Sequence, residues 1–428
     1  MAQICTLTEF QSVITGKEAE GYKTVPEHTF RSLQNFLLEN KGRKNALEFM
    51  SITARKGLGT VITAQNYVGM IVMNDGTVFE ILPKIYHADT GDEGIRQTKK
   101  ILLDMLRTLP NAPFKSIQTS NMNTEKMPLL EWFIRKFLDE VLSIVKHGLK
   151  HSYNPVESNE LFLKGQLIFP EQIRKNFAHR ERNYIRYDVF NDNCPENRLL
   201  KSALLFVSRR SVSAKNRRDI RNLLDAFDPV PASKNYEADF ENCSSGRDAK
   251  EYRLALIWAK VFLQSKSFTA YSGSEVSFAL LYPMETIFES YIAHKIRQHI
   301  DRTAFTVTAQ EKKKYLFQRP DKHFLLKPDI VVRHHTENRT FIMDTKWKLL
   351  AEGKGNYGIS QGDMYQMYAY QKRYAARSVT LIYPLAAETP KDQKIWYQSE
   401  DNAFVRVRFV DLLHIDSSID RLISEVLL

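Results

Sequence analysis

Two β-rich runs near the C-terminus constrain this chain more than any other feature of its sequence. Residues 324–350 read FLLKPDIVVRHHTENRTFIMDTKWKLL, in which two runs of strand-forming side chains flank the turn-prone TENR. Such a pattern predicts an antiparallel β-hairpin, with its turn centred on Glu337 and Asn338. Since side chains alternate between the two faces of a strand, the turn decides which residues share a face.

Three charged side chains would meet on one face of this hairpin. A turn at that position places Asp329 opposite Lys346 and Asp344 opposite Val331, so that two carboxylates and one ammonium converge. A carboxylate beside an apolar run costs free energy unless it is compensated, and Mg²⁺, which prefers oxygen ligands, would compensate it. Lys346 could orient or deprotonate an attacking water. The residues therefore predict metal-assisted phosphodiester hydrolysis, and the alternative is an Asp–Lys salt bridge across a hairpin.

Two expected helices flank the hairpin in sequence. The apolar spacing in residues 283–300 predicts a helix with Glu289 at the margin of its buried face, from which it could reach a metal site. Residues 363–373 predict a second helix that places Gln366 and Tyr370 four residues apart on one face. Gln366 could hold a DNA phosphate or the catalytic lysine. The alternatives are an exposed glutamate and a polar position on a packed helix.

The remaining sequence predicts a β-rich N-terminal part and a helical middle. Asn74-Asp75-Gly76 between two β-rich runs predicts a hairpin, because glycine tolerates the positive φ of tight turns. A long amphipathic helix is expected from Pro128 to Gly148, a strand at 161–169 and a helix at 197–207.

A chain of 428 residues is expected to form two or three domains. We place a β-rich domain at 1–125, a mainly helical region with a basic surface at 126–262, and the hairpin domain at 263–428. Basic residues are dense from Pro195 to Arg221, which predicts either a nucleic-acid surface or a solvated helix face.

Charge and composition narrow the classes of partner. Lys and Arg outnumber Asp and Glu by 61 to 50, and the resulting formal charge of +11 is consistent with a polyanionic partner such as DNA. The three cysteines are far apart without metal-ligand spacing, so we expect reduced thiols and no zinc site. No apolar stretch has the length of a signal peptide or a membrane span, so a cytoplasmic protein without a membrane partner is expected.

The C-terminal residues resemble the PD-(D/E)XK nuclease signature. The set Pro328, Asp329, Asp344, Thr345 and Lys346 is similar to its acidic and lysine positions, Glu289 to its upstream helical glutamate, and Gln366 with Tyr370 to its QxxxY motif. Within that superfamily the chain resembles the McrC family, the nuclease subunits of 5-methylcytosine-dependent McrBC restriction systems. The supporting segments are YVGMIVMNDGTVFEILPKI (67–85), LKGQL (163–167), CPENRLLKSAL (194–204) and PMETIFESYIAHKI (283–296). The first sixty residues match no known pattern.

This resemblance implies an α/β fold, α+β overall, whose C-terminal restriction-endonuclease-like domain has a mixed central sheet flanked by helices. It implies a type IV restriction endonuclease subunit that cuts DNA with Mg²⁺ bound by Asp329, Asp344, the Thr345 backbone carbonyl and Glu289. It also implies a hexameric AAA+ GTPase partner, McrB-like, which this chain stimulates and which docks on the β-rich N-terminal part. GTP would bind that partner, and this chain contains no G-x-x-x-x-G-K-[ST] motif.

Two other functions remain open from the sequence. The chain could be a non-catalytic adaptor that binds DNA and raises the GTPase rate of a AAA+ motor. It could also be a nuclease that acts alone on nucleic acid. Separate assays of GTPase stimulation and of cutting, with and without a partner, distinguish the three.

Overall fold

The computed structural model describes residues 4–16, 18–39, 49–85, 91–109, 127–243, 249–264, 276–386, 389 and 394–427. These residues form two compact units. The smaller unit consists of residues 127–279 with the turn Asn74–Gly76, and the larger unit combines the rest of the N-terminal part with residues 280–428. The expected division into three domains stays a prediction.

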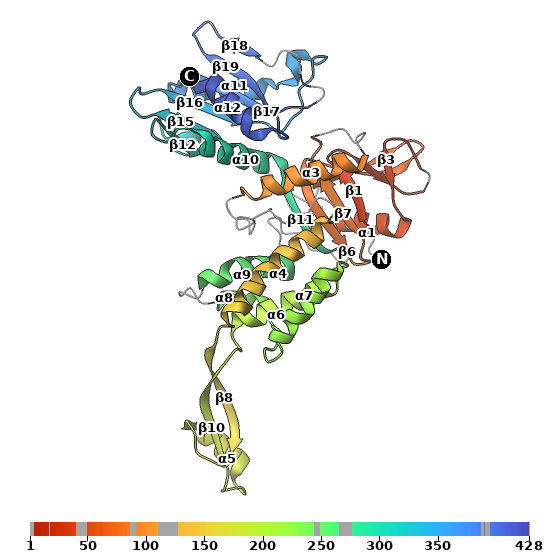
Figure 1. The fold of residues 1–428 in the computed structure, drawn as a ribbon, viewed down its shortest axis with the longest axis vertical. Coiled ribbons are helices and arrows are strands. Elements are labelled where there is room, and N and C mark those ends of the chain that lie inside the picture. Colours follow the sequence, from red (N-terminus) through yellow and green to blue (C-terminus); the bar gives the residue numbers. More distant parts are fainter. Residues whose placement is uncertain are drawn as a thin grey trace. The chain divides into compact units, whose positions relative to one another are not determined.

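Two four-stranded sheets build the N-terminal part of the larger unit (Figure 1). The first has the order β1 (Ile4–Thr8), β7 (Val78–Leu82), β6 (Tyr67–Met73) and β11 (Val276–Pro283). The second has the order β3 (Tyr22–Thr24), β2 (Ser12–Ile14), β5 (Gly59–Ala64) and β4 (Met50–Arg55). Helices α1 (Glu27–Glu39) and α3 (Gly91–Leu106) contact strands β6 and β7 respectively.

The expected hairpin around Asn74-Asp75-Gly76 is confirmed. Strands β6 and β7 pair antiparallel, and Gly76 adopts a φ of 87°, the conformation that favours glycine in the turn. A second glycine, Gly69, lies where β6 meets β11. A Cβ at Gly69 would stand 2.0 Å from the Leu280 carbonyl oxygen, so no larger side chain fits between the two strands.

Helices dominate the smaller unit. Its helices are α4 (Leu129–His147), α6 (Pro195–Ser208), α7 (Ala214–Ala226), α8 (Tyr236–Glu241) and α9 (Ala249–Gln264). The helix expected between Pro128 and Gly148 is confirmed as α4, and Gly148 ends it with a φ of 96°. A three-stranded sheet of β8 (Ser152–Glu160), β10 (Asn183–Asn191) and β9 (Gln166–Leu167), with α5 (Phe169–Asn176), projects from one end of this helical bundle (Figure 1).

The strand expected at 161–169 is wrong in position. The long strand is β8, in the polar sequence before it, and only Gln166–Leu167 of the expected segment joins the sheet. Gly165 turns the chain with a φ of 75°, and a Cβ there would lie 2.4 Å from the Arg186 carbonyl oxygen. The apolar residues 161–163 therefore form an exposed connection, with only Gly165 close to β10, and backbone pairing with β10 outweighs the low strand propensity of β8.

The C-terminal part of the larger unit contains a mixed six-stranded sheet. Its order is β12 (Phe305–Ala309), β15 (Ile330–His334), β16 (Thr340–Thr345), β17 (Ser378–Pro384), β19 (Phe404–Val410) and β18 (Trp396–Gln398). The pairs β16–β17 and β17–β19 are parallel and the others antiparallel. Helices α10 (Met284–His299), α11 (Gln361–Tyr374) and α12 (Ile415–Leu427) contact the sheet, and β13 (Tyr315–Phe317) with β14 (His323–Leu325) forms a small separate hairpin. The expected α/β class with a mixed sheet and flanking helices is confirmed.

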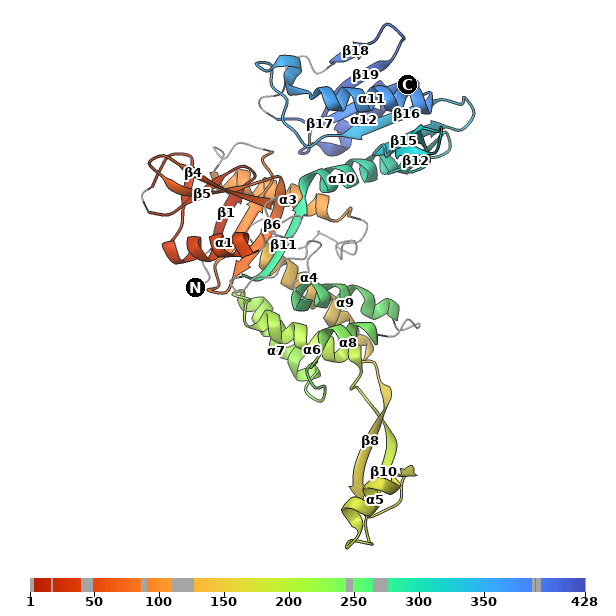
Figure 2. The ribbon, with the colours of Figure 1, turned by 180° about the vertical axis from the view of Figure 1, so that it is seen from behind.

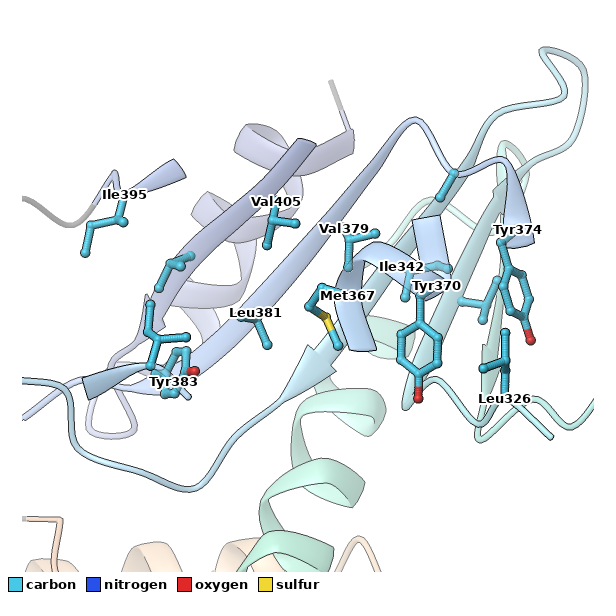
Figure 3. Close-up of a cluster of buried hydrophobic side chains, with 14 of the residues drawn as sticks. Leu326, Ile342, Met367, Tyr370, Tyr374, Val379, Leu381, Tyr383, Ile395 and Val405 are labelled. Carbon is cyan, nitrogen blue, oxygen red and sulfur yellow. The ribbon is translucent and has the colours of Figure 1, made fainter. Parts of the chain in front are cut away.

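Both faces of this sheet are buried. On one face, Met367 and Tyr370 of α11 pack with Ile342, Val379 and Leu381 (Figure 3). Residues that alternate with these, such as Ile330 and Met343, are fully buried and point to the opposite face. Consequently a charged side chain on either face of these strands is removed from water unless it lies at a strand end.

Strand β11 joins the N-terminal sheet to this C-terminal sheet. It ends at Pro283, and α10 begins at the next residue (Figure 2). The Met284 backbone N–H donates to the Asn66 carbonyl at 2.9 Å, and the Asn66 amide donates to Glu285 at 3.3 Å. The first turn of α10 is therefore held by the N-terminal sheet.

Candidate active site

The hairpin β15–β16 forms as expected, but its register differs by two residues. Val331 pairs with Ile342, where the prediction paired it with Asp344, and the ladder continues to Arg333 and Thr340. The predicted register is therefore wrong. Because of this pairing, the centre of the turn lies earlier than expected, and Asn338, near the end of the turn, adopts a left-handed φ of 48°. A shift of two residues preserves the face of every side chain, whereas a shift of one would have reversed it.

Asp329 lies immediately before β15, where one more step of the observed register brings it opposite Asp344. Its Oδ2 accepts hydrogen bonds from the Thr345 backbone N–H at 2.7 Å and from the Thr345 hydroxyl at 2.8 Å. Burial raises the pKa of Asp329 above its usual value, although these two hydrogen bonds oppose the shift. Thr345 therefore orients the Asp329 carboxylate through its amide and hydroxyl.

Asp344 is a carboxylate almost fully removed from water. It is 2% exposed, and its Oδ2 lies 2.7 Å from the Lys346 Nζ. Burial raises the pKa of Asp344 to about 7, and the neighbouring charge of Asp329 adds to the shift. A buried carboxylate whose pKa is raised by the charge of a second carboxylate favours a proton or a cation between the two. The expectation that Asp329, Asp344 and Lys346 converge on one face is met by the geometry.

Lys346 is held in its charged form. Burial alone would lower the pKa of Lys346, but the carboxylates of Asp344, Asp363 and Asp329 raise it above the usual value. Nζ also donates to Gln366 Oε1 at 3.3 Å, and Gln366 Nε2 donates to the Tyr370 hydroxyl at 2.7 Å. Two partners were predicted for Gln366, a DNA phosphate and the catalytic lysine, and the structure shows a hydrogen bond with the lysine.

Asp363 is a residue of this site that the sequence reasoning missed. Its Oδ1 lies 3.6 Å from the Lys346 Nζ. Asp363 stands in the first turn of α11, and its backbone N–H donates to the side chain of Ser360, the N-cap residue, at 3.1 Å. The Ser-x-x-Asp spacing marks a helix start in the sequence, but nothing in the sequence indicates that this carboxylate approaches the lysine.

Glu289 approaches from α10 without joining the carboxylate pair. It is half-buried, and burial followed by the charge of Asp329 raises the pKa of Glu289 to about 7. The Gln310 side chain hydrogen-bonds to it. Among the described residues, no three His, Cys, Asp or Glu side chains lie close enough to bind one ion together. The roles predicted for Glu289 stay predictions.

A cleft of about 1170 Å³ opens beside Glu289 and Gln310 in the larger unit. Arg107, Lys295 and Arg297 also line it.

Within the described ranges, no helix is sufficiently long and apolar to cross a lipid bilayer.

The donor atoms suit a hard divalent cation. Asp329 and Asp344 lie at the ends of the neighbouring strands β15 and β16, burial raises the pKa of both, and the charge of Asp329 adds to the shift at Asp344 because the two carboxylates repel each other. A cation between them would relieve that repulsion, and oxygen ligands of this kind are those that Mg²⁺ prefers. The residues present therefore fit magnesium, with the Thr345 backbone carbonyl as the further oxygen ligand predicted from the sequence.

The mixed six-stranded sheet with its flanking helices defines an α/β protein, and two acidic residues and a lysine lie at the ends of its strands β15 and β16. A family model described as McrBC 5-methylcytosine restriction system component matches residues 62–384. The chain belongs to this family.

Solved structures agree with that family. The chain is similar to a chain in the half-complex refined from a tetradecameric assembly of Thermococcus gammatolerans McrB AAA+ hexamers with bound McrC, with a TM-score of 0.70 at 19% identity over 99% of this chain and 100% of that one. It is also similar to a chain in the cryo-EM structure of the T. gammatolerans McrBC complex, with a TM-score of 0.50 at 19% identity over 70% and 89%. A search of curated protein sequences finds no match.

Proposed function

We propose that this chain is the nuclease component of a modification-dependent restriction complex, cutting DNA with Mg²⁺ and stimulating a AAA+ GTPase partner. The observation that carries the proposal is the meeting of Asp329, Asp344 and Lys346 at the buried ends of the neighbouring strands β15 and β16. Buried carboxylates that repel each other destabilise the fold, so an isolated structural role explains them poorly. A salt bridge alone would need one carboxylate, and here three surround the lysine.

In this mechanism Asp329 and Asp344 would hold the metal, which would supply a polarised water and a positive charge to the reaction. Lys346, held charged by its carboxylate neighbours, orients the attacking water and offsets charge that develops on the phosphoryl group. Gln366 keeps the Lys346 ammonium in place, and the Tyr370 hydroxyl holds Gln366. Glu289, with a pKa of about 7, supports the metal or the water.

The proposal of a partner is supported by one structural neighbour, a chain in an assembly of McrB AAA+ hexamers with bound McrC. We infer that this chain also binds a AAA+ GTPase, which reads the modified base, 5-methylcytosine in the family description, and hydrolyses GTP. The basic residues of α6 and α7 are candidates for DNA contacts. Some of them already have partners in the smaller unit, since Arg198 pairs with Asp239 at 2.6 Å and Arg217 donates to the Ser211 carbonyl.

The test is Lys346→Ala, assayed with the AAA+ partner, GTP, Mg²⁺ and methylated DNA. We expect cutting to fall by about a hundredfold or more, because removal of one group that stabilises transition-state charge costs that much. GTPase stimulation, measured in the same samples, should be unchanged. Lys322→Ala, which removes an exposed lysine between β13 and β14, is the matched control.

Unaltered cutting by Lys346→Ala would overturn the mechanism. No cutting by the wild-type complex, with GTPase stimulation intact, would instead support the adaptor function. Cutting by the wild-type chain without a partner would support a nuclease that acts alone.

A further inference from the structure

The residue after the lysine of the site, Trp347, is held by the distant N-terminal sheet. Its indole N–H lies 3.1 Å from Oε1 and 3.0 Å from Oε2 of Glu9, so it donates to both carboxylate oxygens. The two residues are separated by 338 positions in the sequence. Its ring packs against Phe288, with ring centroids 5.2 Å apart. Trp347 therefore lies between a carboxylate of the N-terminal sheet and an apolar side chain of α10.

Glu9 is buried and fixed at the end of β1. It is 1% exposed, its backbone N–H donates to the Leu82 carbonyl at 2.9 Å, and its Oε2 accepts from the Lys84 backbone N–H at 3.0 Å. Burial raises the pKa of Glu9 to about 7, although the Lys84 amide and the indole oppose the shift. A buried carboxylate costs free energy, and the partners of the Glu9 carboxylate, directly after β1, are an indole N–H and a backbone N–H.

Trp347 is connected to two residues of the candidate site, Lys346 and Glu289. Lys346 precedes it directly, and Phe288, on which it packs, precedes Glu289 on α10. The backbone at Lys346 is held from the other side, since its N–H donates to the Ile382 carbonyl of β17 at 2.9 Å. Rotation of the Trp347 side chain would therefore remove a constraint on the backbone of Lys346. It would also remove the contact with the turn of α10 that contains Phe288.

We propose that Glu9 is a positioning residue for the nuclease reaction. It holds Trp347, and through Trp347 it sets the backbone of Lys346 and the approach of Glu289. The inference rests on the proposed nuclease function and goes beyond it, because it makes the N-terminal sheet a part of the catalytic apparatus. A movement of β1 or β7 on binding a partner would reach the Lys346 backbone through this carboxylate and Trp347.

The experiment is a double-mutant cycle in the full chain, reconstituted with its AAA+ partner, GTP and Mg²⁺. Glu9→Gln keeps the size of the side chain but leaves one acceptor oxygen for two N–H donors. Trp347→Phe removes the indole N–H and keeps an aromatic ring against Phe288. Cutting is followed at several DNA concentrations, so that the rate at saturation is separated from KM.

We expect each single variant to lower the saturating rate by about tenfold, with KM for DNA unchanged, because small displacements of a catalytic group reduce the rate without weakening substrate binding. The double variant should be no slower than the slower single variant, since the two residues act through one contact. Glu80→Gln is the control: Glu80 is a buried carboxylate of β7 paired with Lys99 at 2.6 Å. It should lower the melting temperature and leave the saturating rate unchanged.

Three results would overturn the inference: a normal rate for Glu9→Gln, multiplicative effects in the double variant, or an equal loss of rate for Glu80→Gln. Lys346→Ala in the same series separates this inference from the proposed function. If Lys346→Ala is inactive while Glu9→Gln cuts normally, only the positioning role fails. If Lys346→Ala cuts at the wild-type rate, the nuclease mechanism itself fails.

Discussion

Two antiparallel hairpins of this protein distribute their side chains in opposite ways. In β15–β16 of the larger unit, strand residues are buried and a carboxylate, Asp344, lies among them at 2% exposure. In β8–β10 of the smaller unit, nine residue pairs form a longer ladder, yet large apolar side chains at its end are exposed, with Phe162 at 81% and Phe177 at 79%. One hairpin buries charge and the other exposes apolar surface.

Each arrangement costs free energy in the isolated chain, and each therefore indicates a missing component of a different kind. Buried carboxylates need a compensating cation, whereas exposed apolar side chains gathered at one end of a sheet mark a protein contact. We infer that the proposed metal ion completes β15–β16 and that another protein, for which the proposed AAA+ partner is the candidate, contacts the exposed apolar end of β8–β10.

The largest effect that tests this contrast is the loss of cutting in Asp344→Asn. We expect a decrease of about a hundredfold to a thousandfold, because a neutral amide removes a metal ligand and a partner of Lys346. The same change on the exposed hairpin, Glu157→Gln, breaks an ion pair with Arg186 at 2.5 Å and should leave cutting unchanged. Similar losses in both variants would remove the distinction between the hairpins.

Magnesium should stabilise the protein in the absence of any DNA. A ligand at a hundred times its dissociation constant adds about 2.7 kcal/mol to the free energy of unfolding, and the melting temperature should rise accordingly. Differential scanning calorimetry with Mg²⁺ and with chelator measures this shift. The shift should be absent in Asp344→Asn and retained in Glu157→Gln. A persistent shift in Asp344→Asn would place the ion elsewhere.

Stability should also fall with rising pH because of Glu9. Its folded pKa, about 7, is above its usual value of 4.5, so the folded state binds the proton more tightly. The stabilising contribution is complete below pH 4.5 and is lost as pH rises through 7, at a cost of about 2 kcal/mol between pH 5 and pH 8. The charge of Lys84 lowers the pKa of this carboxyl, and the charge of Glu285 raises it. In urea denaturation, Glu9→Gln should show a weaker pH dependence than the wild type, and an equal one would contradict the assignment.

The smallest effect concerns the exposed hairpin. Phe162→Ser with Phe177→Ser should weaken binding of the AAA+ partner by about tenfold, the scale of one modest contact residue, and leave the melting temperature of the free chain nearly unchanged. Phe10→Ser, at a 54% exposed aromatic residue of the N-terminal part, tests the docking site expected from the sequence. A larger loss of affinity in Phe10→Ser would confirm docking of the partner at the N-terminal part and refute docking at β8–β10.

Much of the candidate site could be predicted because it depends on short-range rules. Alternation along strands put Asp329, Asp344 and Lys346 on one face even though the predicted register was two residues off. Helical spacing likewise placed Gln366 above Tyr370, and their hydrogen bond is present. Asp363 could not be predicted to approach Lys346, since that contact depends on how α11 packs on the sheet.

The sequence by itself determined the local elements: the β6–β7 turn at Gly76, the helix between Pro128 and Gly148, and the charged face of β15–β16. These depend on backbone conformations and periodicities that a few neighbouring residues decide. Only the tertiary structure decided that β8 is the strand of the projecting sheet and that Glu9 contacts Trp347. Such contacts join residues far apart in the chain, and the free energy of packing and pairing that selects them is not written in any local pattern.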